Sequence, residues 1–331
     1  MVNFLHKEAF SFITRRTGET KLGETVFLPQ NWEELATFEG KFVILGIPED
    51  IGIRANYGRA GAASGWQHFL PAFLNMQSNA FFKVKEIAVL GAIDVYDLQI
   101  EAEQLDATED IQRLRNLVVR LDERVDKVIS QIIAFNKIPI IIGGGHNNAF
   151  PIIQAFSRSS PVNCLNIDPH ADCRELEGRH SGNPFSYAYE QGYLKKYVLL
   201  GMSESYNNTY ILDSLEKMQA TVFSYEDIFV KHMCSIEEVK TAIAGQLVGT
   251  KVGFELDLDS ITDFPVSAVN PNGFSPEAIR SLVYFFASTL QPLYFHLPEF
   301  APELAPNNDN RYAKLLTVIV ADFIKGVDSH H

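Results

Sequence analysis

The sequence predicts an α/β fold built on a mostly parallel sheet with helices on both faces. Short runs of residues are apolar at almost every position, which is the pattern of strands buried on both faces. These runs alternate with longer stretches whose apolar residues recur every three or four positions, as on a helix that covers a sheet. Repeated alternation of strand and helix favours parallel pairing and a sheet covered on both sides.

The expected strands and helices follow one another along the whole chain. Strands are predicted, in chain order, at residues 42–47, 87–90, 138–142, 162–167, 197–200, 251–258 and 293–297. Helices are predicted at residues 112–135, 235–247, 276–288 and 310–324. Neither a low-complexity linker nor an internal repeat interrupts this pattern. Residues 1–331 are therefore expected to form a single domain.

Composition and charge favour a soluble globular enzyme. Of the 331 residues 46% are hydrophobic, which is enough for a large core. The 41 acidic residues outnumber the 28 Lys and Arg residues, and the net charge of −13 argues against nucleic acid or an anionic membrane as a partner. No apolar run approaches the ~18–20 residues needed to span a bilayer.

Two further features predict a cytoplasmic protein. Residues 1–16 contain no long hydrophobic core and do not read as a signal peptide. The three cysteines, Cys164, Cys173 and Cys234, are an odd number without a CxxC pair, which favours reduced thiols. Cys173 stands beside a candidate metal ligand, but it is expected to be a small buried residue rather than a ligand.

The most informative segment is DPHAD, residues 168–172, which follows an apolar run. Asp168, His170 and Asp172 are three potential metal ligands at every second position. If the strand continues into this segment, all three side chains point to one face of the sheet. Pro169 is compatible with this, because the residue before a proline avoids the helical region.

Two other candidate clusters also follow predicted strands. The segment GGGH ends in His146, and the segment DLD supplies Asp257 and Asp259. Each has a simpler interpretation on its own, since a glycine run is often a tight turn and an Asp pair often caps a helix. In a parallel sheet, however, sites form at the carboxyl ends of strands, where all three clusters fall. So many buried carboxylates also need cations to stay charged.

The six candidate ligands indicate the kind of metal. Two histidines and four carboxylates, without a paired thiolate, suit two divalent ions such as Mn²⁺ better than a structural zinc. A single-zinc hydrolase of the deacetylase type is disfavoured, because the expected pair of adjacent histidines is not visible and six ligands exceed the need of one zinc ion.

The three motifs, in this order and at these separations, resemble the ureohydrolase superfamily of arginase, agmatinase and formimidoylglutamase. The resemblance covers nearly the whole chain, from residues 46–50 to residues 297–302. It implies a three-layer α/β/α sandwich with a mostly parallel sheet of about eight strands, and two Mn²⁺ ions per chain.

The resemblance also assigns roles to the ligands. One metal would be held by His146, Asp168, Asp172 and Asp257. The other would be held by Asp168, His170, Asp257 and Asp259, so that Asp168 and Asp257 bridge the pair. Four carboxylates balance two dications and let them share a water whose pKa falls toward neutral pH. Glu299 would face the cationic carbon of the substrate, although an exposed acid at the start of a helix remains the alternative.

Substrate-binding residues are expected from the same resemblance. Arg174, two residues beyond the last DPHAD ligand, offers a planar fork to a carboxylate, as in formimidoylglutamases. The segment containing Asn56 and Arg59 is also similar to that branch. Arg59 would read the same anion, or else brace its glycine-rich loop by binding backbone carbonyls.

Several positions depart from the arginase pattern. The column that holds a catalytic His in arginases is Ser181 here, and His180 is displaced by one residue. His180 and Ser181 are therefore both candidates for proton transfer, beside Asp172 and Glu299. Glu255 stands where the family usually carries Ser, and Asp263 is shifted by one from the usual Asp-Pro.

We expect a dinuclear manganese amidinohydrolase that cleaves N-formimidoyl-L-glutamate to L-glutamate and formamide in histidine breakdown. Its substrate would be a small amidine or guanidine that carries a carboxylate, and the chain would form a homo-oligomer. One alternative is the hydrolysis of another guanidino compound, of the arginase, agmatinase or guanidinobutyrase type. Another is a catalytically silent member of the family that binds metal as a regulator or scaffold.

Overall fold

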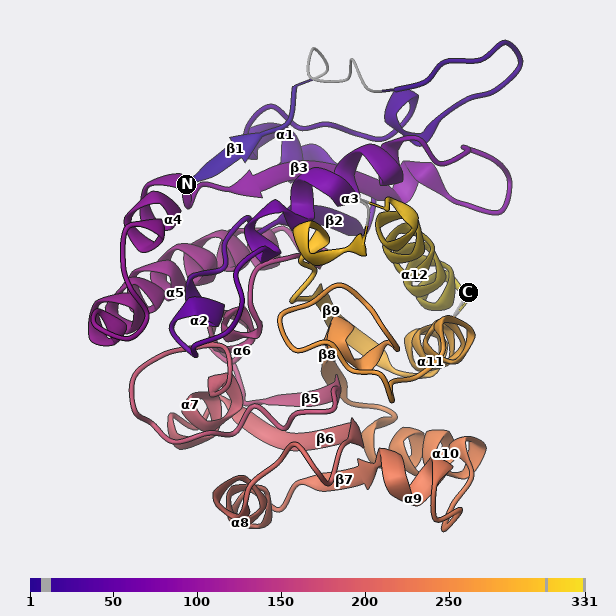
Figure 1. Cartoon of the computed structure of the whole chain (residues 1–331). Helices are drawn as coiled ribbons and strands as arrows, with labels where there is room; N and C mark the ends of the chain where they lie inside the picture. Colours follow the sequence, from indigo (N-terminus) through magenta and orange to yellow (C-terminus); the bar gives the residue numbers. More distant parts are fainter. Residues whose placement is uncertain (7–12, 307–308, 330–331) are drawn as a thin grey trace.

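The computed structural model of the chain describes residues 1–6, 13–306 and 309–329. Residues 7–12 of the amino-terminal stretch considered above lie outside this part. The described residues form one nine-stranded sheet in the order β1-β3-β2-β4-β9-β8-β5-β6-β7 (Figure 1). Its strands are β1 (Val2–Phe4), β2 (Phe42–Gly46), β3 (Ile87–Ile93), β4 (Ile138–Ile142), β5 (Val162–Ile167), β6 (Leu194–Met202), β7 (Thr221–Ser224), β8 (Lys251–Leu256) and β9 (Gln291–Leu297).

Eight of these strands run parallel, as the sequence predicted. Only the edge strand β1 is antiparallel, and it pairs Val2 with Ile93 of β3. The predicted sheet of about eight strands is thus confirmed, with β1 as an addition. Sequence reasoning missed β1 and β7 because each is only three or four residues long and neither is a continuous apolar run.

Helices cover both faces of the sheet, which makes the predicted three layers. One face carries α3, α10, α11 and α12, and the other carries α4, α5, α6, α7 and α8 (Figure 1). The α-helices are α1 (Trp32–Thr37), α2 (Ile51–Arg54), α3 (Gly65–Leu74), α4 (Tyr96–Glu103), α5 (Ile111–Ala134), α6 (Ala149–Phe156), α7 (Pro184–Glu190), α8 (Thr209–Lys217), α9 (Tyr225–Phe229), α10 (Ile236–Leu247), α11 (Pro276–Thr289) and α12 (Arg311–Asp328).

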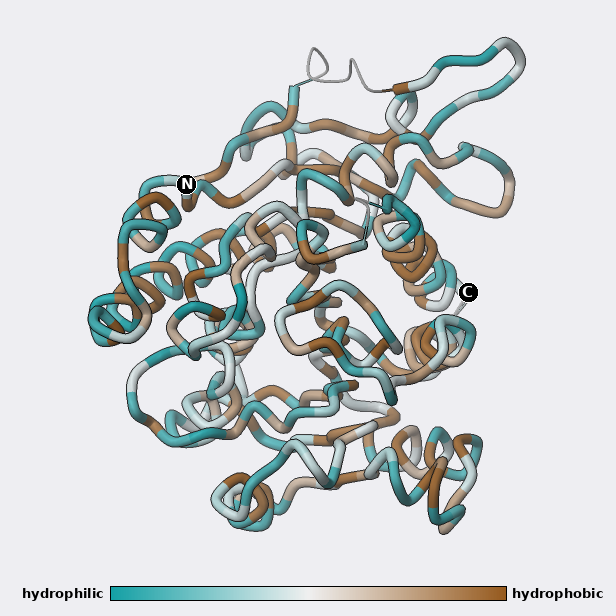
Figure 2. Tube along the Cα trace, viewed as in Figure 1, coloured by the Kyte–Doolittle hydropathy of each residue, from teal (hydrophilic) through white to brown (hydrophobic). Residues whose placement is uncertain are grey.

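Strand alternation divides the interior into two cores, one on each face. In β2, Phe42 and Ile44 join the core under α3 and α12, while Val43 and Leu45 join the core under α5. Both cores are apolar, which explains why the central strands lack polar alternation. Hydrophobic and hydrophilic residues follow one another along α5 and α12 in Figure 2, as expected for helices with one face on a sheet.

Four central strands bring the predicted ligand segments together. The carboxyl ends of β4, β9, β8 and β5 are neighbours in the sheet, and they lead into the segments that begin at Gly143, Pro298, Asp257 and Asp168. Parallel pairing places all of these segments on the same edge. Among the described residues, no helix is both long enough and apolar enough to span a bilayer.

Candidate metal centre

The DPHAD segment is a loop rather than a continuation of β5. The strand ends at Ile167, and Asp172 adopts a φ of 47°, so strand alternation is not what aligns the three ligands. The loop is shaped by hydrogen bonds. Asp168 Oδ1 accepts the backbone N–H of His170 at 2.6 Å, and Asp168 Oδ2 accepts from Asn166 Nδ2 at 2.9 Å. These bonds orient the Asp168 carboxylate.

The GGGH segment places His146 by an unusual backbone path. Gly143 and Gly144 have φ values of 84° and 73°, a region that favours glycine. The carboxylate of Glu49 then accepts the N–H of Gly145 at 2.8 Å and a side-chain N–H of Asn148 at 2.6 Å. Glu49 is fully buried. It therefore acts as an internal brace that fixes the loop carrying His146.

The predicted ligands meet in two groups that share Asp168. The first group is His146, Asp168, Asp172 and Asp257, and the second is Asp168, His170 and Asp259. His146 Nδ1 lies 2.9 Å from Asp257 Oδ2, 3.0 Å from Asp172 Oδ2 and 3.2 Å from Asp168 Oδ2. In the second group, His170 Nδ1 lies 2.8 Å from Asp259 Oδ2.

The chemistry of this donor set fits divalent cations. Three carboxylate oxygens surround His146 Nδ1, yet this buried nitrogen has no hydrogen-bond partner of acceptable geometry among the described residues. Separations of about 3 Å are those of adjacent ligands on an octahedral ion with bonds of about 2.1 Å. Asp168 belongs to both groups, as expected for a bridge, whereas Asp257 is grouped with His146 and not with His170.

Electrostatics in the centre are dominated by crowded negative charge. Burial, together with the charges of Asp257 and Asp172, raises the pKa of Asp168 to about 6. Burial and the charge of Asp257 also raise the pKa of Asp259 well above its usual value. Burial opposes a charged His170, but the carboxylates of Asp259 and Asp168 outweigh it and raise the His170 pKa. Cations among these groups would offset the repulsion.

Glu299 lies beside the first group of ligands. It follows β9 in a loop, has a φ of 72°, and is 7% exposed. Its Oε1 accepts the backbone N–H of His146 at 2.9 Å. Burial and the charge of Asp257 raise the Glu299 pKa well above its usual value. It is thus an acid turned into the centre, and not the exposed helix-leading residue of the alternative interpretation.

A cavity of about 450 Å³ opens onto this centre. Nine residues that the sequence singled out line it, among them two ligands from the second group. They are Asn56, Arg59, His170, Asp172, Arg174, Ser181, Asp257, Asp259 and Glu299. Asp168 and His146 lie behind this surface and are fully or almost fully buried.

The two arginines of the cavity have different surroundings. The Arg174 side chain is 47% exposed and lies 3.6 Å from Glu177, so its planar fork is accessible. The Arg59 guanidinium donates to the carbonyl of Ser267 at 2.6 and 2.9 Å and to that of Val266 at 3.3 Å. Arg59 therefore braces its loop, as the simpler interpretation held, while still lining the cavity.

Ser181 and His180 lie on opposite sides of the backbone. Ser181 lines the cavity, and its Oγ accepts from Asn56 Nδ2 at 3.3 Å. The ring of His180 is fully buried and does not line the cavity. Its Nδ1 accepts the N–H of Gly182 at 3.1 Å, and its Nε2 lies 3.3 Å from Glu177 Oε1. Burial and the charges of Arg174 and Arg115 lower the His180 pKa to about 3.

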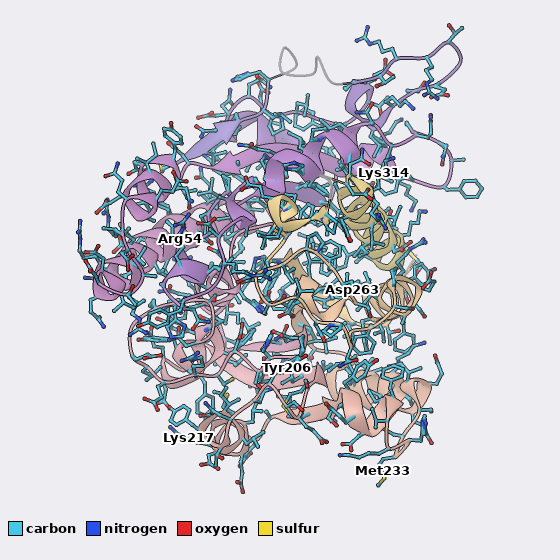
Figure 3. All side chains as sticks on the ribbon, in the orientation of Figure 1. Arg54, Tyr206, Lys217, Met233, Asp263 and Lys314 are labelled. Atoms are coloured by element: carbon cyan, nitrogen blue, oxygen red, sulfur yellow. The ribbon has the colours of Figure 1, made fainter. Side chains whose placement is uncertain are left out.

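Two residues of the site escaped the sequence reasoning. Tyr206 stacks on the ring of His170 with centroids 5.5 Å apart, and it lies near the middle of the molecule in Figure 3. Asn207 accepts the N–H of Ala171 at 2.9 Å and donates to the carbonyl of Pro169 at 3.0 Å, which clamps the DPHAD loop. Both residues follow shortly after a predicted strand, and this position was the sequence signal that could have identified them as part of the site.

Comparison with known proteins gives one consistent family. The model of the arginase family matches residues 40–324. A formimidoylglutamase of Streptococcus pyogenes is 26% identical over 321 residues, which cover 92% of this chain and 90% of the relative.

Solved structures of the same fold are also similar. A formimidoylglutamase from Bacillus subtilis has a TM-score of 0.76 at 14% identity and covers 95% of this chain and 94% of its own. A Trypanosoma cruzi formiminoglutamase solved with Mn²⁺ has a TM-score of 0.74 at 22% identity, with coverage of 95% and 100%. Proclavaminate amidino hydrolase from Streptomyces clavuligerus has a TM-score of 0.74 at 16% identity, with coverage of 97% and 99%. Since the family model spans most of the residues, the chain belongs to the arginase family.

Proposed function

We propose that this arginase-family hydrolase holds two Mn²⁺ ions in the candidate metal centre. His146, Asp168, Asp172 and Asp257 would hold one ion, and His170, Asp259 and Asp168 the other. The observation that supports this most strongly is the meeting of three carboxylate oxygens at His146 Nδ1, a buried nitrogen to which no described residue makes a hydrogen bond. Divalent ions bound there supply Lewis acidity, which makes water a nucleophile near neutral pH.

The substrate we propose is N-formimidoyl-L-glutamate, which water converts to L-glutamate and formamide. Glu299, whose carboxylate is not assigned to a metal, brings a negative charge to the cavity that suits a cationic amidine. Arg174 lines the same cavity and has an accessible guanidinium. The two ends of the substrate would thus be bound by opposite charges, which favours an amidine that also carries a carboxylate.

Individual side chains take separate roles in this proposal. Glu299 orients the amidine carbon, and Arg174 fixes the distal carboxylate. Asn56 and Ser181, which contact one another, line the wall between these ends. We assign proton transfer to Asp172 and Ser181, which line the cavity, whereas the His180 ring would have to leave its buried position to take part.

A second candidate is the hydrolysis of a guanidino compound with a single carboxylate. The observation in its favour is Arg59, whose three hydrogen bonds go to the carbonyls of Ser267 and Val266. With Arg59 engaged in this way, Arg174 is left as the accessible cation for a carboxylate. N-formimidoyl-L-glutamate carries two carboxylates. A guanidino acid with one carboxylate would need only one cationic side chain to bind it.

We also propose that residues 1–331 act as one ureohydrolase domain that works as a homo-oligomer in the cytoplasm. Its partner in this role is a small molecule, and the net charge of −13 gives no attraction to nucleic acid. Size-exclusion chromatography coupled to light scattering would measure the oligomeric state directly.

The deciding experiment is an assay of the Mn²⁺-loaded chain on four compounds. These are N-formimidoyl-L-glutamate, 4-guanidinobutyrate, L-arginine and agmatine, with formamide and urea measured separately. We expect formamide from the first compound and loss of activity with a chelator. Urea release from 4-guanidinobutyrate alone would establish the second candidate. Two bound metals without turnover of any compound would support a silent regulator or scaffold.

A further inference from the structure

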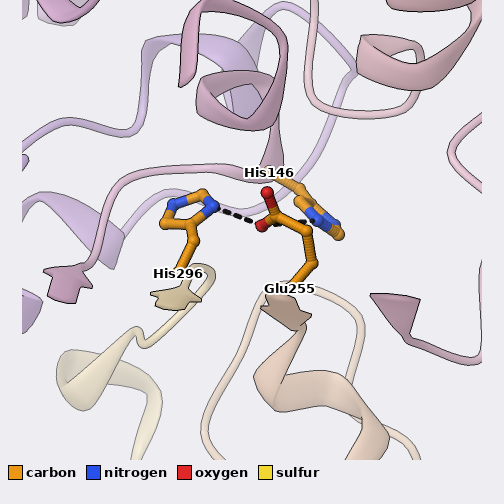
Figure 4. A group of neighbouring side chains, drawn as sticks. All are labelled: His146, Glu255 and His296. Atoms are coloured by element: carbon orange, nitrogen blue, oxygen red, sulfur yellow. Dashed lines mark hydrogen bonds and ion pairs between the residues drawn. The ribbon is translucent and has the colours of Figure 1, made fainter. Parts of the chain in front are cut away.

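A buried polar group stands behind His146, on the side away from the other ligands. It consists of Glu255 from β8 and of Tyr294 and His296 from β9. The side chains of all three are fully buried. Figure 4 shows the Glu255 carboxylate between the rings of His296 and His146. A buried carboxylate in this place requires an explanation, because desolvating its charge is costly without partners.

The Glu255 carboxylate is held from two sides. Its Oε1 accepts the hydroxyl of Tyr294 at 2.7 Å, and its Oε2 lies 2.6 Å from His296 Nδ1. The same Oε2 lies 3.6 Å from His146 Nε2. That distance is longer than a hydrogen bond, but His146 Nε2 has no other hydrogen-bond partner among the described residues. Glu255 is therefore the acceptor toward which this N–H can donate.

The geometry of this group favours a hydrogen-bonded network over a third metal site. Two ligands on one ion with bonds of about 2.0–2.2 Å are separated by about 3 Å or more. The 2.6 Å between Glu255 Oε2 and His296 Nδ1 is shorter than this and matches a charge-assisted hydrogen bond. His146, Glu255 and His296 thus lie as close as metal ligands, while the distance between Glu255 and His296 is that of a donor and an acceptor.

We propose that Glu255 is a positioning residue for the metal centre, and this inference rests on the proposed pair of Mn²⁺ ions. By accepting the proton of His146 Nε2, Glu255 selects the tautomer in which Nδ1 offers its lone pair to a metal. Tyr294 and His296 keep the carboxylate in place. The device thus places a carboxylate behind one ligand. Hydrogen bonding of a ligating histidine to a carboxylate raises its basicity and fixes its ring.

A metal titration of single variants tests this role. The chelator-stripped full chain and its Glu255→Gln variant would be titrated with Mn²⁺ by calorimetry. The wild type should bind two ions. In Glu255→Gln one ion should bind about 10–100-fold more weakly, the usual effect of changing such a partner, while the ion on the His170 side keeps its affinity. Tyr294→Phe removes one of the two supports and should weaken the same ion by a smaller factor.

An electron paramagnetic resonance spectrum adds a readout that general loss of stability would not change. At two equivalents of Mn²⁺, Glu255→Gln should show more of the isolated-ion signal and less of the coupled pair. Asp122→Asn is the matched control, because Asp122 is a buried carboxylate that pairs with Arg179 and touches none of the ligand side chains. It should retain two ions with wild-type affinities.

The outcomes separate this inference from the proposed function. If the wild type binds no Mn²⁺, the metal centre itself is disproved. If the wild type binds two ions and Glu255→Gln keeps both affinities within twofold, only the role of Glu255 is overturned. Equal weakening of both ions together with a lower melting temperature would likewise overturn it, since that is the result of a merely structural role. A third ion in the wild type would replace the network by a metal site.

Discussion

The carboxylate of Glu299 and the backbone of His146 are joined by a hydrogen bond of 2.9 Å between Glu299 Oε1 and His146 N. This bond connects the loops after β9 and β4, which are neighbours in the sheet. Glu299 therefore both supplies charge to the cavity and helps to place a ligand.

Glu299→Gln is predicted to lower kcat about 100-fold or more on every amidine or guanidine that the enzyme accepts. The amide oxygen can still accept the N–H of His146, but the charge that faces the cationic carbon is lost. Steady-state kinetics on two substrates would measure the effect, with metal content as the control. An unchanged kcat with both metals bound would contradict the role of Glu299.

Arg174→Lys is predicted to lower kcat/KM for N-formimidoyl-L-glutamate about 5- to 150-fold. This corresponds to a loss of about 1–3 kcal/mol in binding of the transition state. Lysine keeps the charge but loses the planar fork for a carboxylate. Any residual activity on agmatine, which has no carboxylate, serves as the control and should be insensitive to the change. Arg59→Lys is the matched variant, and it should mainly lower the melting temperature by freeing the carbonyl of Ser267. Equal losses on both substrates would mean that Arg174 does not bind a carboxylate.

Asp168→Ala is predicted to abolish binding of both Mn²⁺ ions, because Asp168 belongs to both ligand groups. Asp257→Ala should come next, since its Oδ2 lies 2.9 Å from His146 Nδ1 in the more crowded group. Asp259→Ala should retain one ion. Elemental analysis after dialysis would count the metals, and an Asp259→Ala protein with no metal would speak against two separable sites.

His180→Asn is predicted to make the protein less sensitive to acid. The pKa of His180 is about 3 when folded, against about 6.5 when unfolded, so the unfolded chain takes up the proton first. The contribution of His180 to the free energy of unfolding of the wild type is fully present above about pH 6.5. It is lost as the pH falls toward 3, by on the order of 3–5 kcal/mol. Asn keeps an acceptor for the N–H of Gly182 and does not titrate.

Urea unfolding of both proteins between pH 7 and pH 4 would measure this difference, with a chelator present so that metal release affects neither curve. The free energy of unfolding should fall more steeply with decreasing pH in the wild type than in the variant. Curves that stay parallel would show that His180 is not held neutral by its surroundings.

Much of the fold and the ligand set could be predicted from the sequence, for physical reasons. Strands buried on both faces are apolar throughout, so β4, β5 and β8 were visible as runs, and each ligand segment stands directly after one. The edge strand β1 was not visible, because it is three residues long. The side on which His180 lies was also hidden, since it depends on contacts with Glu177 and Gly182 in three dimensions.

Contacts between distant segments explain the remaining features of the site that the sequence did not predict. Asn207 stabilises the DPHAD loop from 36 residues away, and its bonds to Ala171 and Pro169 leave no local pattern. The Glu255 position was recognised as a departure from the family, but its meaning required His296, which lies 41 residues further along the chain. The sequence pattern of a strand or helix indicates whether its faces are buried. It does not indicate which side chain from a distant segment contacts it.

The place of β9 in the sheet has a consequence for how the protein matures. Although β9 is the last strand among the described residues, it lies between β4, which leads to His146, and β8, which leads to Asp257. All six ligands precede residue 260, so they leave the ribosome before the strand that unites them. A nascent chain that ends before residue 291 carries every ligand but cannot bring His146 to the others. Capture of the proposed metals would therefore await the synthesis of β9, and tight Mn²⁺ binding would report that the central sheet has closed.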